Sequence, residues 1–120
     1  MQSHKDLIVW QRGIQIVKVV YLLSGKLPKS EAYGLSSQMR RAAVSIPSNI
    51  AEGYSRGHRP EYIQFLRVAF GSAAELETQL ILVRELKLLA GDELVSAESQ
   101  TQEILRMLNR LINSLSPKNR

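Results

Sequence analysis

The residues best suited to specific chemistry form one polar stripe in the stretch 38–56. Its members are three or four residues apart and would share one face of a helix: Arg41, Ser45, Ser48, Asn49, Glu52 and Arg56. Guanidinium groups bind phosphate and carboxylate oxygens, while hydroxyl and amide groups both donate and accept hydrogen bonds. The stripe therefore predicts either an anion site or a hydrogen-bonded network within the protein.

Two interpretations of this stripe remain open on residue types alone. As a structural network, it would pair Arg40 or Arg41 with Glu52 or Glu75 and so set the register of two helices. The members of that network would be Arg41, Ser45, Asn49, Glu52 and Glu75. As a nucleic-acid site, it would place arginines on phosphates and Asn49 on a base or on the backbone. The residues predicted to contact nucleic acid are Arg12, Lys18, Arg40, Arg41, Arg56 and Arg59.

Catalytic chemistry has no comparable candidate. The chain has two histidines, His4 and His58, and neither belongs to a pattern typical of a zinc site. Ser45 has no neighbouring histidine to activate it, and the chain has no cysteine. An enzyme using Glu52 or Glu75 with Arg41 would lack a convergent acid/base pair. We therefore expect a protein that is not an enzyme, with no catalytic residue, no metal site and no cofactor.

Length and composition limit the fold to one helical domain over residues 1–120. The chain is 44% apolar, with seven glycines and four prolines, which excludes both a disordered chain and a sandwich of short strands. The absence of cysteine favours a reducing, cytoplasmic setting. The longest apolar run, Val19 to Leu23, has five residues, so we expect no membrane-spanning segment.

Helical periodicity divides the chain into four stretches at about 4–24, 33–55, 60–90 and 92–115. Ser3 to Asp6 has the form of a capping box, and Gly53 and Gly57 mark the end of the second stretch. The regular stripe of the third consists of Tyr62, Leu66, Ala69, Ala73, Leu76, Leu80 and Val83. Because the joints are short, the helices should form an antiparallel up-down-up-down four-helix bundle, an all-α fold.

The first stretch is apolar on more than one side. One stripe has the spacing of a core face: Leu7, Trp10, Ile14, Val17 and Tyr21. Further apolar residues lie on the remaining faces, and a bundle of this length has little interior to cover them. We expect a subunit interface along this helix, with Val20 facing away from its own bundle.

The net charge of +5 is unevenly distributed along the sequence. Residues 1–60 carry a net +6, residues 61–103 a net −5 and residues 104–120 a net +4. Such zoning permits an anionic partner, and it equally permits basic and acidic faces that meet in the fold or between subunits.

The stretch 38–53, QMRRAAVSIPSNIAEG, together with GSAAELET at 71–78, closely resembles the four-helix bundle family encoded in intervening sequences of bacterial 23S ribosomal RNA genes. Trp10, Tyr21 and Pro28 also fit that pattern. The resemblance implies a bundle that assembles as a ring of five subunits, a homopentamer, without enzyme activity. The family is similar to the accessory variability protein of diversity-generating retroelements, which binds a reverse transcriptase and nucleic acid.

These observations predict a non-catalytic homo-oligomer, a pentamer, associated with nucleic acid and most plausibly with structured RNA. The alternative is a protein-interaction scaffold, or an accessory subunit of a reverse transcriptase, with no RNA specificity of its own. Beyond itself, the expected partners are RNA or another nucleic acid and a reverse transcriptase, and no membrane.

Overall fold

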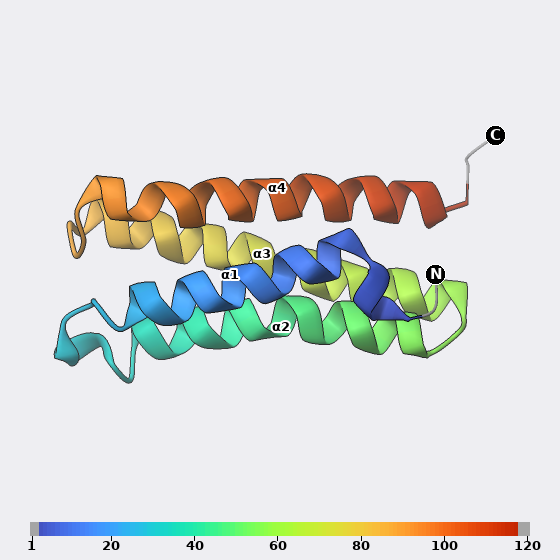
Figure 1. Ribbon diagram of the computed structural model, residues 1–120, viewed down its shortest axis with the longest axis horizontal. Helices are drawn as coiled ribbons and strands as arrows, with labels where there is room; N and C mark the ends of the chain where they lie inside the picture. The colour runs from blue at the N-terminus through green and yellow to red at the C-terminus, as the bar shows by residue number, and fades with distance from the viewer. Residues whose placement is uncertain (1–2, 118–120) are drawn as a thin grey trace.

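The computed structural model describes residues 3–117, and within them the chain forms four long helices and no strand (Figure 1). The helices are α1 (Ile8–Ser24), α2 (Leu35–Ser55), α3 (Arg59–Glu85) and α4 (Gly91–Leu115). Two short 3-10 turns, His4–Asp6 and Lys29–Glu31, precede α1 and α2. The predicted all-α four-helix fold is therefore confirmed.

Successive helices run antiparallel and pack side by side, and α1 also packs against α4 (Figure 1). The bundle measures 47 × 29 × 20 Å. α2 lies between α1 and α3 and makes no packing contact with α4. No described helix has the length and apolar character needed to cross a membrane.

The buried face of α3 follows the predicted stripe. Six of its members are at most 1% exposed: Leu66, Ala69, Ala73, Leu76, Leu80 and Val83. The intervening positions are mixed, and α3 leaves apolar residues such as Val68 and Ile81 exposed on its other faces. Its length differs from prediction, since α3 ends at Glu85 and Lys87 takes a left-handed φ of 56°.

The stripe predicted to form the core face of α1 is wrong, because α1 is rotated about its axis and buries a different set of residues. The buried residues of α1 are Val9, Gly13, Ile16, Val20, Leu23 and Ser24. Val20, expected to face away from the bundle, is 0% exposed. Several stripes of equal spacing exist on so apolar a helix, and contact with the neighbouring helices selects one of them. The exposed large apolar residues of α1 are Ile8, Tyr21 and Leu22.

Contact between α1 and α2 is closest at Gly13. A Cβ atom there would lie 3.2 Å from the Cβ of Pro47, which is buried in the middle of α2. Any larger side chain at residue 13 would push the two helices apart. This contact explains why α1 turns its glycine toward α2 and buries Ile16 and Val20 beside it.

Gly53 has the same role between α2 and α3. As predicted, Gly53 and Gly57 lie on either side of the end of α2 at Ser55, and Gly53 is in addition a close helix contact. The residue is buried inside α2, and an added Cβ would lie 2.6 Å from the Cβ of Phe65. Gly57, with a φ of +66°, is the glycine that follows the helix end. Gly53 thus allows close packing of α2 on α3.

Ion pairs join the basic and acidic zones of the sequence within the fold. Arg12 on α1 pairs with Glu103 on α4 at 2.5 Å, and Lys26 lies 3.7 Å from Glu93. Both pairs connect the basic N-terminal segment to the acidic segment. Part of the charge zoning therefore serves the fold itself.

Arg84 closes the connection between α3 and α4. Its guanidinium donates to both carboxylate oxygens of Glu98, at 2.9 and 2.7 Å, and to the carbonyl of Gly91 at 3.1 Å. The hydrogen bond from Arg84 lowers the pKa of Glu98 and raises the pKa of Arg84. This bidentate pair fixes the geometry of the turn after α3.

Substitution of Gly53 with alanine should destabilise the protein, because the new methyl group would meet the Cβ of Phe65 and separate α2 from α3. Overpacking of this kind costs about 1–3 kcal/mol. Gly71 is the matched control: it is exposed within α3 and has open space around it, so alanine there should stabilise by up to about 1 kcal/mol. Thermal unfolding followed by circular dichroism would compare the two variants. Equal melting temperatures would contradict the close packing at Gly53.

Replacement of Glu98 with glutamine should lower stability at neutral pH and have little effect in acid. The folded-state pKa of Glu98 is depressed, so its contribution is present above the unfolded-state pKa and is lost as pH falls through the folded-state pKa. Urea midpoints of wild type and Glu98→Gln should therefore differ at pH 7 and converge as the pH approaches 3. A constant difference across that range would argue against the ion pair as the cause.

Candidate nucleic-acid interface

A shallow hollow of about 730 Å³ runs over the outer face of α2 and combines two arginines with two tyrosines. We call it the α2 groove. It is lined by Tyr21, Ala32, Tyr33, Ser37, Arg40, Arg41, Val44, Ser45, Ser48 and Asn49. No carboxylate is among these residues, so the charge of the groove is positive.

Two contacts within the protein position the side chain of Arg40. Its Nε donates to the hydroxyl of Ser24 at 2.8 Å, and its guanidinium carbon lies 4.9 Å from the ring centre of Tyr21. Ser24 is itself buried, and its carbonyl accepts a hydrogen bond from Ser36. Within residues 3–117 only Nε of Arg40 makes a hydrogen bond, which leaves both terminal nitrogens for an anion. Fixing the side chain in advance reduces the entropy lost on binding.

Arg41 lies beside Arg40 and is more exposed. Its Nη1 donates to the hydroxyl of Ser37 at 2.7 Å, within the same helix. No described carboxylate lies within ion-pairing distance of either arginine. The α2 groove therefore presents two guanidinium groups whose partners in the protein are neutral.

Ser45 joins α2 to α3 through hydrogen bonds. The Asn49 Nδ2 donates to the carbonyl and to the hydroxyl of Ser45, both at 2.8 Å, and the hydroxyl of Ser72 on α3 donates to the same hydroxyl at 2.8 Å. Of the predicted network, the structure brings together Ser45 and Asn49. The sequence analysis missed Ser72, whose only signal is a small polar residue in a stretch lacking bulk.

The remaining members of the predicted network lie apart from this cluster. Glu52 lies 3.4 Å from Arg56, and Glu75 accepts a hydrogen bond from Gln79 at 3.5 Å. The expected pairing of Arg40 or Arg41 with Glu52 or Glu75 is not found among residues 3–117. One turn of α2 separates Arg41 from Ser45, but Arg41 instead turns back toward Ser37.

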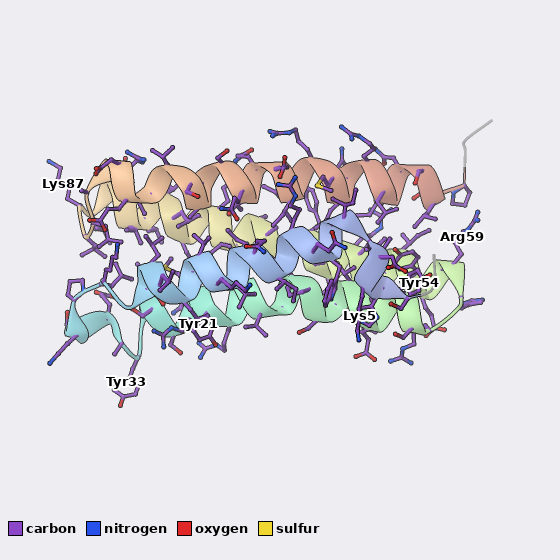
Figure 2. All side chains as sticks on the ribbon, viewed as in Figure 1. Lys5, Tyr21, Tyr33, Tyr54, Arg59 and Lys87 are labelled. Atoms are coloured by element: carbon purple, nitrogen blue, oxygen red, sulfur yellow. The ribbon has the colours of Figure 1, made fainter. Side chains whose placement is uncertain are left out.

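Arg59 lies at the other end of the bundle from Tyr33 (Figure 2), and Arg56 directly follows the last residue of α2. Neither arginine lines the groove. Arg56 is between two carboxylates, 3.4 Å from Glu52 and 3.7 Å from Glu61. Its positive charge is therefore offset locally. Arg59 is exposed in the first turn of α3.

Arg12 and Lys18 are on α1 and also lie outside the groove. Arg12 is occupied by Glu103, whereas Lys18 is exposed and has no described ion-pair partner. Of the six residues predicted to contact nucleic acid, the structure thus brings only Arg40 and Arg41 together in one hollow. Contact of the other four residues with nucleic acid stays a prediction.

Tyr33 is the lining residue that the sequence analysis missed. It is 99% exposed, in the turn between Lys29–Glu31 and α2. Figure 2 shows its side chain projecting away from the bundle. Glu31 supports the turn, because its carbonyl accepts from Gly34 at 3.0 Å and its carboxylate accepts from Leu35 at 3.4 Å.

Two further polar features of residues 3–117 lie outside the groove, an exposed histidine–carboxylate contact and a buried tyrosine hydroxyl. His58 Nδ1 lies 3.6 Å from Glu61. The hydroxyl of Tyr62 is buried without a hydrogen-bond partner, and burial, with Tyr54 nearby, raises its pKa. No cluster of three or more potential metal ligands occurs in residues 3–117.

This chain is similar to a known protein family and to solved structures. The family model of the 23S rRNA-intervening sequence protein matches residues 5–110. Among solved structures, the chain is similar to the crystal structure of a protein with unknown function from the S23 ribosomal protein family of Bacteroides thetaiotaomicron. That pair is 24% identical with a TM-score of 0.82, and the match covers 88% of this chain and 98% of that chain. None of the curated proteins matches.

The structural similarity supports the fold alone, since the identity is low. Neither similarity concerns the accessory variability protein, so that part of the resemblance stays a prediction.

Proposed function

Since the chain belongs to the family of the 23S rRNA-intervening sequence protein, we propose that it is a non-catalytic protein that binds RNA phosphates in the α2 groove. The observation that carries this proposal is the pair Arg40 and Arg41, which share a hollow without a carboxylate. Guanidinium groups bind phosphate oxygens through charge-assisted hydrogen bonds. The proposed setting is the cytoplasm, where RNA and cysteine-free proteins both occur.

The hydroxyl groups of the groove support the same chemistry. Ser45 already accepts hydrogen bonds from Asn49 and Ser72, so its proton remains for a ligand oxygen. Ser48 is exposed in the same lining and adds a second hydroxyl. A groove lined by hydroxyl donors and two positively charged arginines favours an anion over a cation.

Self-assembly, with a pentameric ring as the expected form, is part of the proposal. α1 exposes Ile8 at 60% and Leu22 at 74%, and contact with another subunit would remove this apolar surface from water. Five copies would carry about +25 by formal charge, which would strengthen attraction to RNA. The ring would thus multiply the number of α2 grooves available to one RNA.

A protein-binding scaffold is the second candidate, favoured by exposed apolar residues at the C-terminal end of α3. Ile81, Leu82 and Leu86 are 51%, 43% and 61% exposed. A reverse transcriptase is one partner that the family resemblance implies. Pull-down after nuclease treatment would distinguish the candidates, because a scaffold would retain its protein partner without RNA.

Arg40→Gln combined with Arg41→Gln should weaken binding of 23S ribosomal RNA fragments at least about tenfold at low salt, because charge-assisted bonds to phosphate are lost. The slope of log K against log salt should fall by about 0.7–0.9 for each arginine removed. Fluorescence anisotropy across a salt series measures both quantities.

The matched control is Arg67→Gln with Arg106→Gln, which removes the same charge from exposed residues of α3 and α4. It should weaken binding much less. Arg41→Gln alone tests the groove without disturbing the contacts of Arg40 with Tyr21 and Ser24. Equal losses in both double variants, or no RNA binding by wild type at low salt, would refute the proposed site.

Leu22→Glu should convert the proposed oligomer into monomers, because a carboxylate would be buried in an interface along α1. Light scattering after size exclusion measures the mass. Val95→Glu is the control, since Val95 is 57% exposed and belongs to a different helix, α4. A monomeric wild type, or an unchanged mass for Leu22→Glu, would count against this interface.

A further inference from the structure

We propose that the α2 groove takes a single strand of RNA and that Tyr33 is the platform on which one of its bases stacks. This inference rests on the proposed function and adds the class of nucleic acid that the groove selects. It follows from three features of the groove: an unpacked aromatic ring, a neighbouring pair of guanidinium groups and a length suited to a few nucleotides.

The first feature is the position of Tyr33. Its ring is 99% exposed and has no described aromatic or cation–π partner, although it lines the same hollow as Arg40 and Arg41. The turn that carries it is held by two hydrogen bonds to Glu31, so the ring is presented from an ordered backbone. A tyrosine so placed contributes nothing to the core and offers a free face to a flat ligand.

The second feature is the contrast between Tyr33 and Tyr21. Tyr21 also lines the groove, but its ring is occupied by the guanidinium of Arg40 at 4.9 Å. One tyrosine therefore positions a phosphate-binding cation, while the other keeps its face open. Cations that follow the backbone and an aromatic ring that takes a base are the two elements of single-strand binding sites.

The third feature is length. The groove extends along α2 from its first turn to Asn49, about 20 Å at 1.5 Å per residue. Nδ2 of Asn49 is used by Ser45, which leaves its amide oxygen as an acceptor for a ribose hydroxyl or a base amino group. The guanidinium groups that would donate to phosphate thus lie between an aromatic ring at one end of the groove and a hydrogen-bond acceptor at the other.

These features favour a single strand over a duplex. Bases in a double helix are stacked on one another and present only their edges, so an exposed tyrosine gains no stacking partner there. An unpaired base has a free face, and stacking on an aromatic side chain is tolerant of sequence. The groove should therefore prefer unpaired segments, with little dependence on base identity.

The test uses the full chain with a fluorescein-labelled 12-nucleotide RNA that cannot pair with itself, and with the corresponding 12-base-pair RNA duplex. Wild type should bind the single strand at least about fivefold more tightly than the duplex at equal salt. Tyr33→Ala should weaken single-strand binding at least about fivefold and leave duplex binding within about twofold. Tyr33→Phe should bind within about twofold of wild type, because it retains the ring.

The salt dependence separates stacking from charge. Tyr33→Ala should keep the wild-type salt slope, since it removes no phosphate contact, whereas Arg41→Gln should reduce that slope by about 0.7. Val95→Ala controls for the loss of an exposed apolar side chain that does not line the groove. Circular dichroism should give the same melting temperature for Tyr33→Ala and wild type, because Tyr33 makes no core contact.

The negative results distinguish failure of the stacking role from failure of the proposed function. If the arginine variants lose RNA binding and Tyr33→Ala does not, the stacking role is overturned and the proposed function stands. A preference for the duplex overturns the single-strand inference in the same way. If wild type binds neither RNA at low salt, the proposed function fails and this inference falls with it.

Discussion

The close packing of α2 against both of its neighbours is the constraint on which the rest of the structure depends. Gly13 of α1 meets Pro47, and Gly53 of α2 meets Phe65 of α3, each without room for a larger side chain. These two contacts select the face that α1 buries and bring Ser72 within reach of Ser45. The α2 groove lies on the outer side of α2, which these contacts do not cover.

The role of each arginine in this protein depends on the side chains that surround it. Arg12, Arg56 and Arg84 each face a carboxylate, so each serves mainly to join helices or turns. Arg40 and Arg41 differ because their neighbours are hydroxyl groups and an aromatic ring. Exposed ion pairs contribute little to stability but cancel charge, and an arginine without such a pair keeps its attraction for an anion. The distribution of carboxylates therefore distinguishes a candidate binding site from structural arginines.

Much of the fold was predictable because apolar residues recur at intervals of three and four along the chain. The regular spacing from Leu66 to Val83 indicated one face of α3, and the structure buries that face. α1 was less predictable, since apolar residues surround it and periodicity cannot choose among equivalent stripes. The polar stripe of α2 was correctly located as the chemical face. Its internal pairing was not, because hydrogen-bond partners such as Ser37 and Ser72 depend on side-chain rotation and on a second helix.

Periodicity and composition are enough to predict an all-α chain of four helices, the polar face of α2 and the absence of thiol chemistry. They do not reveal that Gly53 is a close contact between α2 and α3, that Val20 is core, or that Tyr33 stands beside Arg40 and Arg41. The physical reason is that local pattern specifies which residues can share a helix face. Which faces meet, and which charges are then cancelled, depends on the fit between helices far apart in the chain.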